Sequence, residues 1–157
     1  MSSGCHVVST AFGPLHLAWN DAGLASVSLH RAEALGAPPA WVLEVARRLA
    51  AHLAGHPDPL LDVPLDLSAC PPFHARVYAE LRRVLPGQTV SYGELARRVG
   101  SAGAARAVGQ AVARNPWLLV VPCHRVLAAG GALGGFSAPG GVATKRQLLA
   151  IEAGFAP

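Results

Sequence analysis

Apolar and small polar residues alternate near the start of the chain. The alternation covers residues 15–19 and 24–29, and Asn20-Asp21-Ala22-Gly23 stands between the two runs. A period of two is typical of a strand that buries one face, and short connections rich in Asn, Asp and Gly join antiparallel strands. The pattern predicts a β-hairpin.

The spacing of apolar residues then changes to that of a helix. They recur at every fourth position over 41–54, and Gly55 follows as an ending signal, which predicts a helix. Residues 57–72 contain Pro-Asp-Pro and Pro-Pro steps that regular structure does not tolerate throughout. We therefore predict a domain boundary, with an N-terminal domain over 1–71 and a C-terminal domain over 72–157.

Helical spacing dominates the beginning of the second domain. Residues 73–85 carry one apolar stripe that Pro86-Gly87 stops. Ser91 and Glu94 form a capping box that opens a second helix, and a third is predicted over 102–114. Two short helices around a tight glycine turn are a candidate helix-turn-helix.

The rest of the chain combines a buried segment, a loop and a helix. The apolar run 117–121 predicts a strand-like segment that leads into residues 122–126. The glycine-rich loop over 130–141 lacks the Gly-Lys-Ser/Thr ending of a phosphate-binding loop, and a last helix is predicted over 143–153. The fold class is therefore α+β: a small N-terminal β-hairpin or sheet with a helix, followed by a mostly helical C-terminal domain.

Composition narrows the class of protein. Hydrophobic residues make up 52% of the 157 positions, yet the apolar run 117–121 is far too short to span a bilayer. The N-terminus lacks the basic start and apolar run of an export signal, so we expect a cytoplasmic protein with no membrane partner. Three widely spaced cysteines favour reduced thiols over a disulfide framework.

Charge is unevenly distributed along the chain. Residues 1–71 carry three basic and six acidic side chains and residues 72–157 carry ten and three, so the net charges are −3 and +7. The basic second part favours a polyanionic partner, although an ordinary solvated surface can have the same composition.

Cys123 and His124 are the candidate nucleophile and base. An ordinary thiol is only a few per cent thiolate at neutral pH, so a nucleophilic cysteine needs activation. Neighbours on a strand point to opposite faces, and His124 therefore needs a helical turn or a bridging water to act on Cys123. Glu152 can orient the imidazole as a third member. A structural role for all three residues is the alternative.

The motif Pro122-Cys123-His124-Arg125-Val126 adds weight to the chemical interpretation. It follows Ser91-Tyr92-Gly93-Glu94-Leu95-Ala96, Ala104-Ala105-Arg106-Ala107-Val108-Gly109 and Asn115-Pro116. In order and spacing this set resembles the O6-alkylguanine-DNA alkyltransferases, strongly over about residues 72–155 and faintly before them.

The resemblance implies DNA repair by transfer of an alkyl group, such as methyl, from O6-alkylguanine to Cys123, once per molecule and with no cofactor. His124 would activate Cys123 through a water, with Glu152 behind it. Asn115 would hold the turn that positions the cysteine. Tyr92 would donate a proton towards guanine as charge develops on the leaving base.

The implied partner is double-stranded DNA, held through its minor groove with little sequence readout by a monomeric protein. The target base must leave the stack to be reached, and Arg106 would fill the gap. The small residues Ala105, Ala107 and Gly109 would let the helix approach closely. The other expected contacts are Arg114 and Arg125 for DNA, and Val126, Phe136 and Ser137, with Tyr92, for the base.

Two features bear on how far the resemblance extends. The glycine loop is slightly longer than in some relatives and has Phe136 where others have Tyr, which bears on the tolerance for bulky alkyl groups. Some relatives bind zinc in the N-terminal domain. Here Cys5 with His6, His16 or His30 makes no ligand set of suitable spacing, so no metal is predicted.

Three other functions fit parts of the pattern. A non-catalytic alkyltransferase-like protein lacks the acceptor cysteine, so Cys123 argues against it. A transcription regulator could use the same helix-turn-helix, but 157 residues leave no room for a separate sensing domain. A cysteine hydrolase regenerates its thiol, whereas a thioether on Cys123 has no easy leaving path, so turnover separates the two.

Overall fold

The computed structural model describes residues 2–155 and begins with a three-stranded antiparallel sheet in the order β1-β2-β3. The strands are β1 (Gly4–Thr10), β2 (Gly13–Asn20) and β3 (Gly23–Ser28). The pairing of β2 with β3 confirms the predicted hairpin. β1 is an additional strand at the sheet edge. It is half-buried along most of its length, so its sequence shows no clear alternation.

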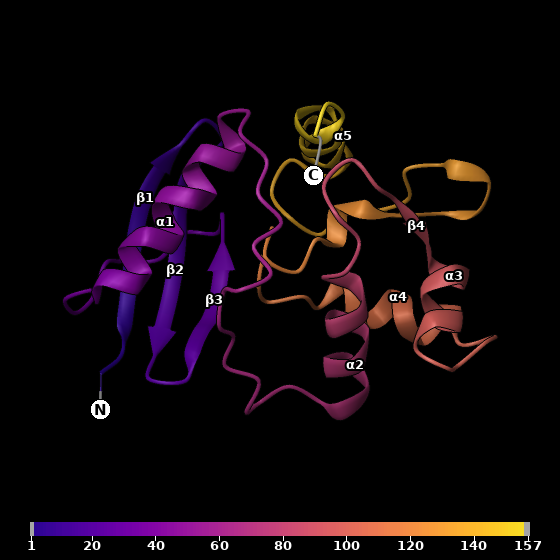
Figure 1. Cartoon of the computed structure of the whole chain (residues 1–157), viewed down its shortest axis with the longest axis horizontal. Helices are drawn as coiled ribbons and strands as arrows, with labels where there is room; N and C mark the ends of the chain where they lie inside the picture. The colour runs from indigo at the N-terminus through magenta and orange to yellow at the C-terminus, as the bar shows by residue number, and fades with distance from the viewer. Residues whose placement is uncertain (1, 156–157) are drawn as a thin grey trace.

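One face of this sheet is covered by α1 (Ala40–Leu53), as Figure 1 shows. Leu15, Leu17 and Trp19 alternate along β2 and are at most 2% exposed. The apolar stripe of α1 packs against these side chains, and its Leu49 is fully buried. The α+β class and the first helix are thus confirmed.

The second part of the chain is mostly helical. Its elements are α2 (Pro72–Leu81), β4 (Val90–Ser91), α3 (Tyr92–Arg98), α4 (Ala105–Ala113), the short 3-10 turns η1 (Cys123–Arg125) and η2 (Ala129–Gly131), β5 (Val126–Leu127) and α5 (Gly141–Glu152). Helix α2 ends earlier than predicted because the backbone N–H groups of Arg83 and Val84 bond carbonyls only three residues back. Within residues 2–155 no helix has the length and apolar character needed to cross a membrane.

Helix α3 begins at a cap of which the sequence predicts one half correctly. Ser91 Oγ accepts a hydrogen bond from Glu94 N at 3.0 Å, as expected. The Glu94 carboxylate does not return to Ser91 but pairs with Arg97 and Arg98 on the next turn of the helix. The i,i+3 and i,i+4 positions bring these arginines within reach, so they compete with the capping box.

The prediction of a strand-like segment over 117–121 is wrong. Only Trp117 forms a bridge to the sheet, opposite Val27, and Leu119 has a left-handed backbone with φ of 72°. Asn115 causes the bend, because its side chain accepts from Trp117 N at 2.9 Å and donates to Val121 O at 2.8 Å. An apolar run satisfies a buried turn as well as a buried strand.

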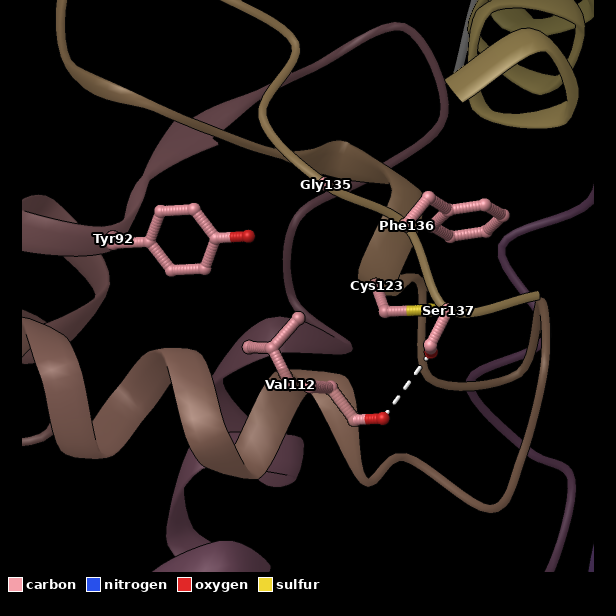
Figure 2. A pocket seen from close by; sticks show the side chains of 7 residues that line it. Tyr92, Val112, Cys123, Gly135, Phe136 and Ser137 are labelled. Atoms are coloured by element: carbon pink, nitrogen blue, oxygen red, sulfur yellow. Dashed lines mark hydrogen bonds between the residues drawn. The ribbon is translucent and has the colours of Figure 1, made fainter. Parts of the chain in front are cut away.

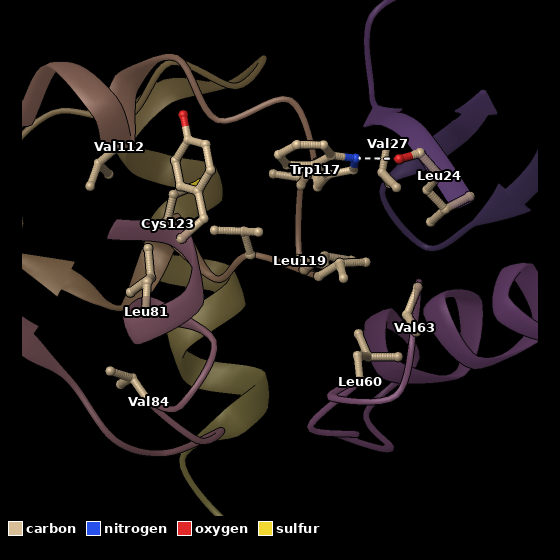
Figure 3. Close-up of a cluster of buried hydrophobic side chains, with 14 of the residues drawn as sticks. Leu24, Val27, Leu60, Val63, Leu81, Val84, Val112, Trp117, Leu119 and Cys123 are labelled. Carbon is tan, nitrogen blue, oxygen red and sulfur yellow. Dashed lines mark hydrogen bonds between the residues drawn. The ribbon is translucent and has the colours of Figure 1, made fainter. Parts of the chain in front are cut away.

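The two parts of the chain meet along β3 and the segment that precedes Cys123. Trp117 Nε1 donates to Leu24 O at 2.7 Å, and the Val27 N–H donates to Pro116 O at 2.9 Å. Figure 3 shows Trp117 between β3 and the helical part, and its ring packs edge-on against Tyr78 at 5.8 Å between centroids. The cysteine turn is therefore anchored on the sheet.

Candidate active site

Cys123 lies beside a small cavity. The cavity has a volume of about 300 Å³ and is lined by Tyr92, Val112, Ala113, Cys123, Gly135, Phe136 and Ser137. Figure 2 shows the Tyr92 hydroxyl pointing into this space and the cysteine sulfur beside Ser137. The Ser137 hydroxyl donates to Ala113 O at 3.2 Å and so ties the glycine-rich loop to the end of α4. A small cavity with few polar groups suits a single flat ligand.

Cys123 is 7% exposed, and the surroundings of its thiol do not ionise it by themselves. Burial raises the pKa of the thiol, while the Asn115 side chain and the positive charge of Lys145 act in the opposite direction. Lys145 is fully buried and donates from Nζ to Val126 O at 2.7 Å. Because burial has the largest effect, a base is needed to generate the thiolate.

Behind the cysteine turn, Glu152 is a buried carboxylate with several donors. Arg125 donates from Nε to Oε1 at 2.8 Å and from Nη2 to Oε2 at 2.7 Å, and His124 Nε2 lies 2.8 Å from Oε2. Burial acts to raise the pKa of Glu152, but the hydrogen bonds from Arg125 and the histidines hold it far below its usual range. Glu152 is therefore an anion at neutral pH.

This anion determines the tautomer of His124. A carboxylate can only accept hydrogen bonds, so the proton of the neutral imidazole is on Nε2 and the lone pair is on Nδ1. Burial lowers the pKa of His124, which keeps the ring neutral. Its Nδ1 is buried and has no hydrogen-bond partner among residues 2–155. The arrangement provides a neutral base next to Cys123 in the chain.

His52 is a member of this cluster that no motif in the sequence singles out. It lies on α1, is fully buried, and places Nε2 2.7 Å from Glu152 Oε2. A signal exists, because His52 falls on the same helical face as Val45 and Leu49. A histidine at a core position needs a buried polar partner, but the sequence does not say which one.

The expected DNA-binding residues separate into two groups. Arg106, Ala107 and Arg114 are exposed on or just after α4, and Ala105 is half-buried there. The assignment of Arg125 to this set is wrong, because its side chain is 1% exposed and its guanidinium is bonded to Glu152 and to Val84 O. A guanidinium group that has lost its water and is already paired with a buried carboxylate is not available to a DNA phosphate.

The remaining expected residues lie around the cavity. Gly109 packs under Tyr92, since a methyl group added there would meet the ring at 3.8 Å. Phe136 and Ser137 line the cavity, whereas Val126 is fully buried and outside its lining. No group of three or more His, Cys, Asp and Glu side chains within residues 2–155 is arranged to hold a metal ion; the absence of metal stays a prediction.

The fold and the site together define a class: an α+β protein with a buried cysteine at a small cavity, a buried histidine–glutamate pair behind it and two packed helices beside it. Residues 72–154 match the family model described as "6-O-methylguanine DNA methyltransferase, DNA binding domain". This match covers more than half of the chain. The chain belongs to the 6-O-methylguanine DNA methyltransferase family.

Individual relatives extend the similarity beyond that region. The methylated-DNA–protein-cysteine methyltransferase of Mycobacterium leprae is 36% identical over 155 residues, which cover 94% of this chain and 91% of the relative. The crystal structure of Mycobacterium tuberculosis O6-methylguanine methyltransferase has a TM-score of 0.83 at 36% identity and covers 99% and 96% of the two chains. A structure of Mycobacterium tuberculosis OGT in complex with DNA has a TM-score of 0.79 at 38% identity, with coverage of 96% and 93%.

Proposed function

We propose that this protein repairs DNA by moving an alkyl group from O6-alkylguanine to Cys123, once per molecule. The observation that carries the proposal is the placement of Cys123 between a base-sized cavity and the buried His124–Glu152 pair. Family membership and the similarity to proteins named for this reaction support it.

The residues divide the chemistry between them. The Cys123 proton passes through a water to Nδ1 of His124, and Sγ attacks the alkyl carbon of the flipped base. An Sγ–C bond forms and the C–O6 bond breaks, with its electron pair moving to guanine. The Tyr92 hydroxyl stabilises that charge. Guanine takes up one proton, which balances the proton that Cys123 has released. Glu152 and Asn115 are positioning residues.

Recognition of DNA is proposed for α3 and α4, which pack against each other as a helix-turn-helix. The exposed side chain of Arg106 would enter the minor groove and replace the flipped nucleotide in the stack. Because Ala105, Ala107 and Gly109 have small side chains or none, DNA can approach the backbone of α4 closely. Because the proposed contacts do not read base edges, little sequence dependence is expected.

The division of the chain into domains at residue 71 is part of the proposal. The family model begins at Pro72, which supports it. The cytoplasmic location and the monomeric state stay predictions.

Mass spectrometry of the protein after mixing with methylated duplex DNA tests the proposal. We expect one methyl group per molecule, on the peptide that contains Cys123, and none in Cys123→Ala. The matched variants Cys5→Ala and Cys70→Ala remove cysteines that are outside the cavity and should react normally. Continued turnover, or methylation at Cys5 or Cys70, would overturn the mechanism. A non-catalytic lesion-binding role predicts bound DNA with no mass change.

A further inference from the structure

His52 connects the N-terminal part of the chain to the centre of the site. It is contributed by α1, one hundred residues before Glu152, and its Nε2 lies 2.7 Å from Glu152 Oε2 with both side chains fully buried. The same oxygen accepts from His124 at 2.8 Å. The carboxylate that orients His124 is therefore shared with a residue from outside the region that matches the family model.

The direction of the His52 hydrogen bond follows from its second contact. The backbone N–H of Asp58 donates to His52 Nδ1 at 3.0 Å, so this nitrogen carries the lone pair. The proton of the neutral ring is consequently on Nε2 and is donated to Glu152. The turn after α1 thus holds His52 in the tautomer that the carboxylate needs.

The hydrogen bond from His52 matters because Arg125 alone does not fix the orientation of the Glu152 carboxylate. The two-point contact of Arg125 holds the Glu152 carboxylate in the plane of the guanidinium group. A hinge motion of the carboxylate about the line through its two oxygens remains possible, because it leaves both Arg125–Glu152 distances unchanged. Among residues 2–155, the other side chains bonded to Glu152 are His52 and His124, and both oppose this tilt. Without His52, His124 would have to hold in place the Glu152 carboxylate that is meant to orient His124.

We propose that His52 is a positioning residue for alkyl transfer, through which the N-terminal part of the chain fixes the tilt of Glu152 and hence the orientation of His124. The inference rests on the proposed roles of Cys123 and His124. It gives residues 1–71 a part in the reaction besides packing.

Two substitutions separate the two hydrogen bonds of His52. His52→Gln places an amide N–H near the position of Nε2 and keeps a donor for Glu152. His52→Asn is shorter, so it can keep an acceptor for the Asp58 N–H but cannot reach the carboxylate. His56→Asn, on the exposed turn that follows α1, is the matched control. His52→Leu also removes the donor and serves if His52→Asn does not fold.

The experiment measures single-turnover rates of the full chain with saturating methylated duplex and with free O6-methylguanine, together with duplex affinity and Tm. We expect His52→Asn to react about tenfold more slowly with both substrates while its duplex Kd stays within about twofold. His52→Gln should stay within about threefold of the wild-type rate even if its Tm falls, and His56→Asn should be unchanged.

Three results would overturn the inference: equal rate losses in His52→Gln and His52→Asn, a loss that follows Tm rather than the donor, or a wild-type rate in His52→Asn. Failure of the proposed function is distinguishable, because the wild-type protein would then leave Cys123 unmethylated.

Discussion

Cys123 stands between two regions of opposite character. Behind it, Glu152 and Arg125 are charged, fully or almost fully buried, and bonded to each other at 2.7 and 2.8 Å. In front of it, α4 presents small residues and the exposed Arg106, and Arg114 is exposed just after the helix. Charges that have lost water need fixed partners, whereas exposed charges keep their hydration and remain available to a ligand.

In the proposed function, this difference separates the residues that carry the chemistry from those that recognise DNA. The buried region can hold a proton acceptor in one orientation, because each side chain there is restrained by others. The exposed region can meet a large polyanion because its side chains are free to adapt. The same residue type therefore occupies opposite environments: Arg125 is buried and bonded to Glu152, whereas Arg106 is exposed and, in the proposed function, meets DNA.

The largest expected effect is on the buried region. Glu152→Gln should lower the free energy of unfolding by about 3–5 kcal/mol, because Arg125 would lose its counter-charge inside the protein. Glu94→Gln breaks exposed contacts with Arg97 and Arg98 and should cost less than about 1 kcal/mol. Urea unfolding measures both variants, and similar losses would contradict the contrast between the two regions.

Tyr92 tests the cavity that lies between the regions. Tyr92→Phe should slow single-turnover transfer by about 3 kcal/mol in activation free energy, roughly 150-fold, because a donor to the leaving base is lost. Duplex affinity should hardly change. Tyr78→Phe removes a buried hydroxyl that donates to Ala111 O and should affect stability without slowing transfer. An unaltered rate in Tyr92→Phe would remove this residue from the mechanism.

Arg106 tests the exposed region. Arg106→Ala should slow repair of methylated duplex about tenfold and leave the reaction with free O6-methylguanine unchanged, since the free base needs no extrusion. Its affinity should fall similarly for all duplex sequences. Arg146→Ala makes the same charge change on the exposed face of α5 and should leave both rates nearly unaltered. Equal losses on both substrates in Arg106→Ala would assign Arg106 to the fold or the pocket.

The smallest expected effect is the acid dependence of stability. Burial lowers the pKa of His124, and the hydrogen-bond donors around Glu152 lower the pKa of Glu152. Below about pH 6.5, the unfolded chain therefore binds more protons than the folded chain. Stability should therefore be fully present above that pH and fall as the pH decreases. The slope for His124 is at most about 1.4 kcal/mol per pH unit. Urea titrations at pH 7.5 and 5.5 should show a smaller decrease in His124→Gln; an unchanged decrease would contradict the buried neutral histidine.

Much of the fold could be predicted from local patterns. The hairpin and the helices follow from periods of two and of three to four residues, and the Ser91 cap follows from its spacing to Glu94. The segment over 117–121 could not, because hydrophobicity alone does not separate a buried strand from a buried turn. Asn115 decides that case through contacts with Trp117 and Val121.

The candidate site could be predicted only where its residues form a sequence motif. Cys123, His124 and Asn115 lie in or near one motif. The cavity brings Tyr92, Phe136 and Ser137 together with Cys123, and their contact with the base stays a prediction. The burial of Arg125 and the presence of His52 could not be predicted, because both depend on which distant side chain occupies the same interior space.

The sequence by itself determined the class of fold, the candidate nucleophile and the family resemblance, since each depends on residue type and spacing along the chain. Only the tertiary structure decided which charges face inward and which histidines share the Glu152 carboxylate. The physical reason is that burial and hydrogen-bond partnership are set by contacts between residues far apart in the chain. Local patterns carry no information about those contacts beyond the need for a partner.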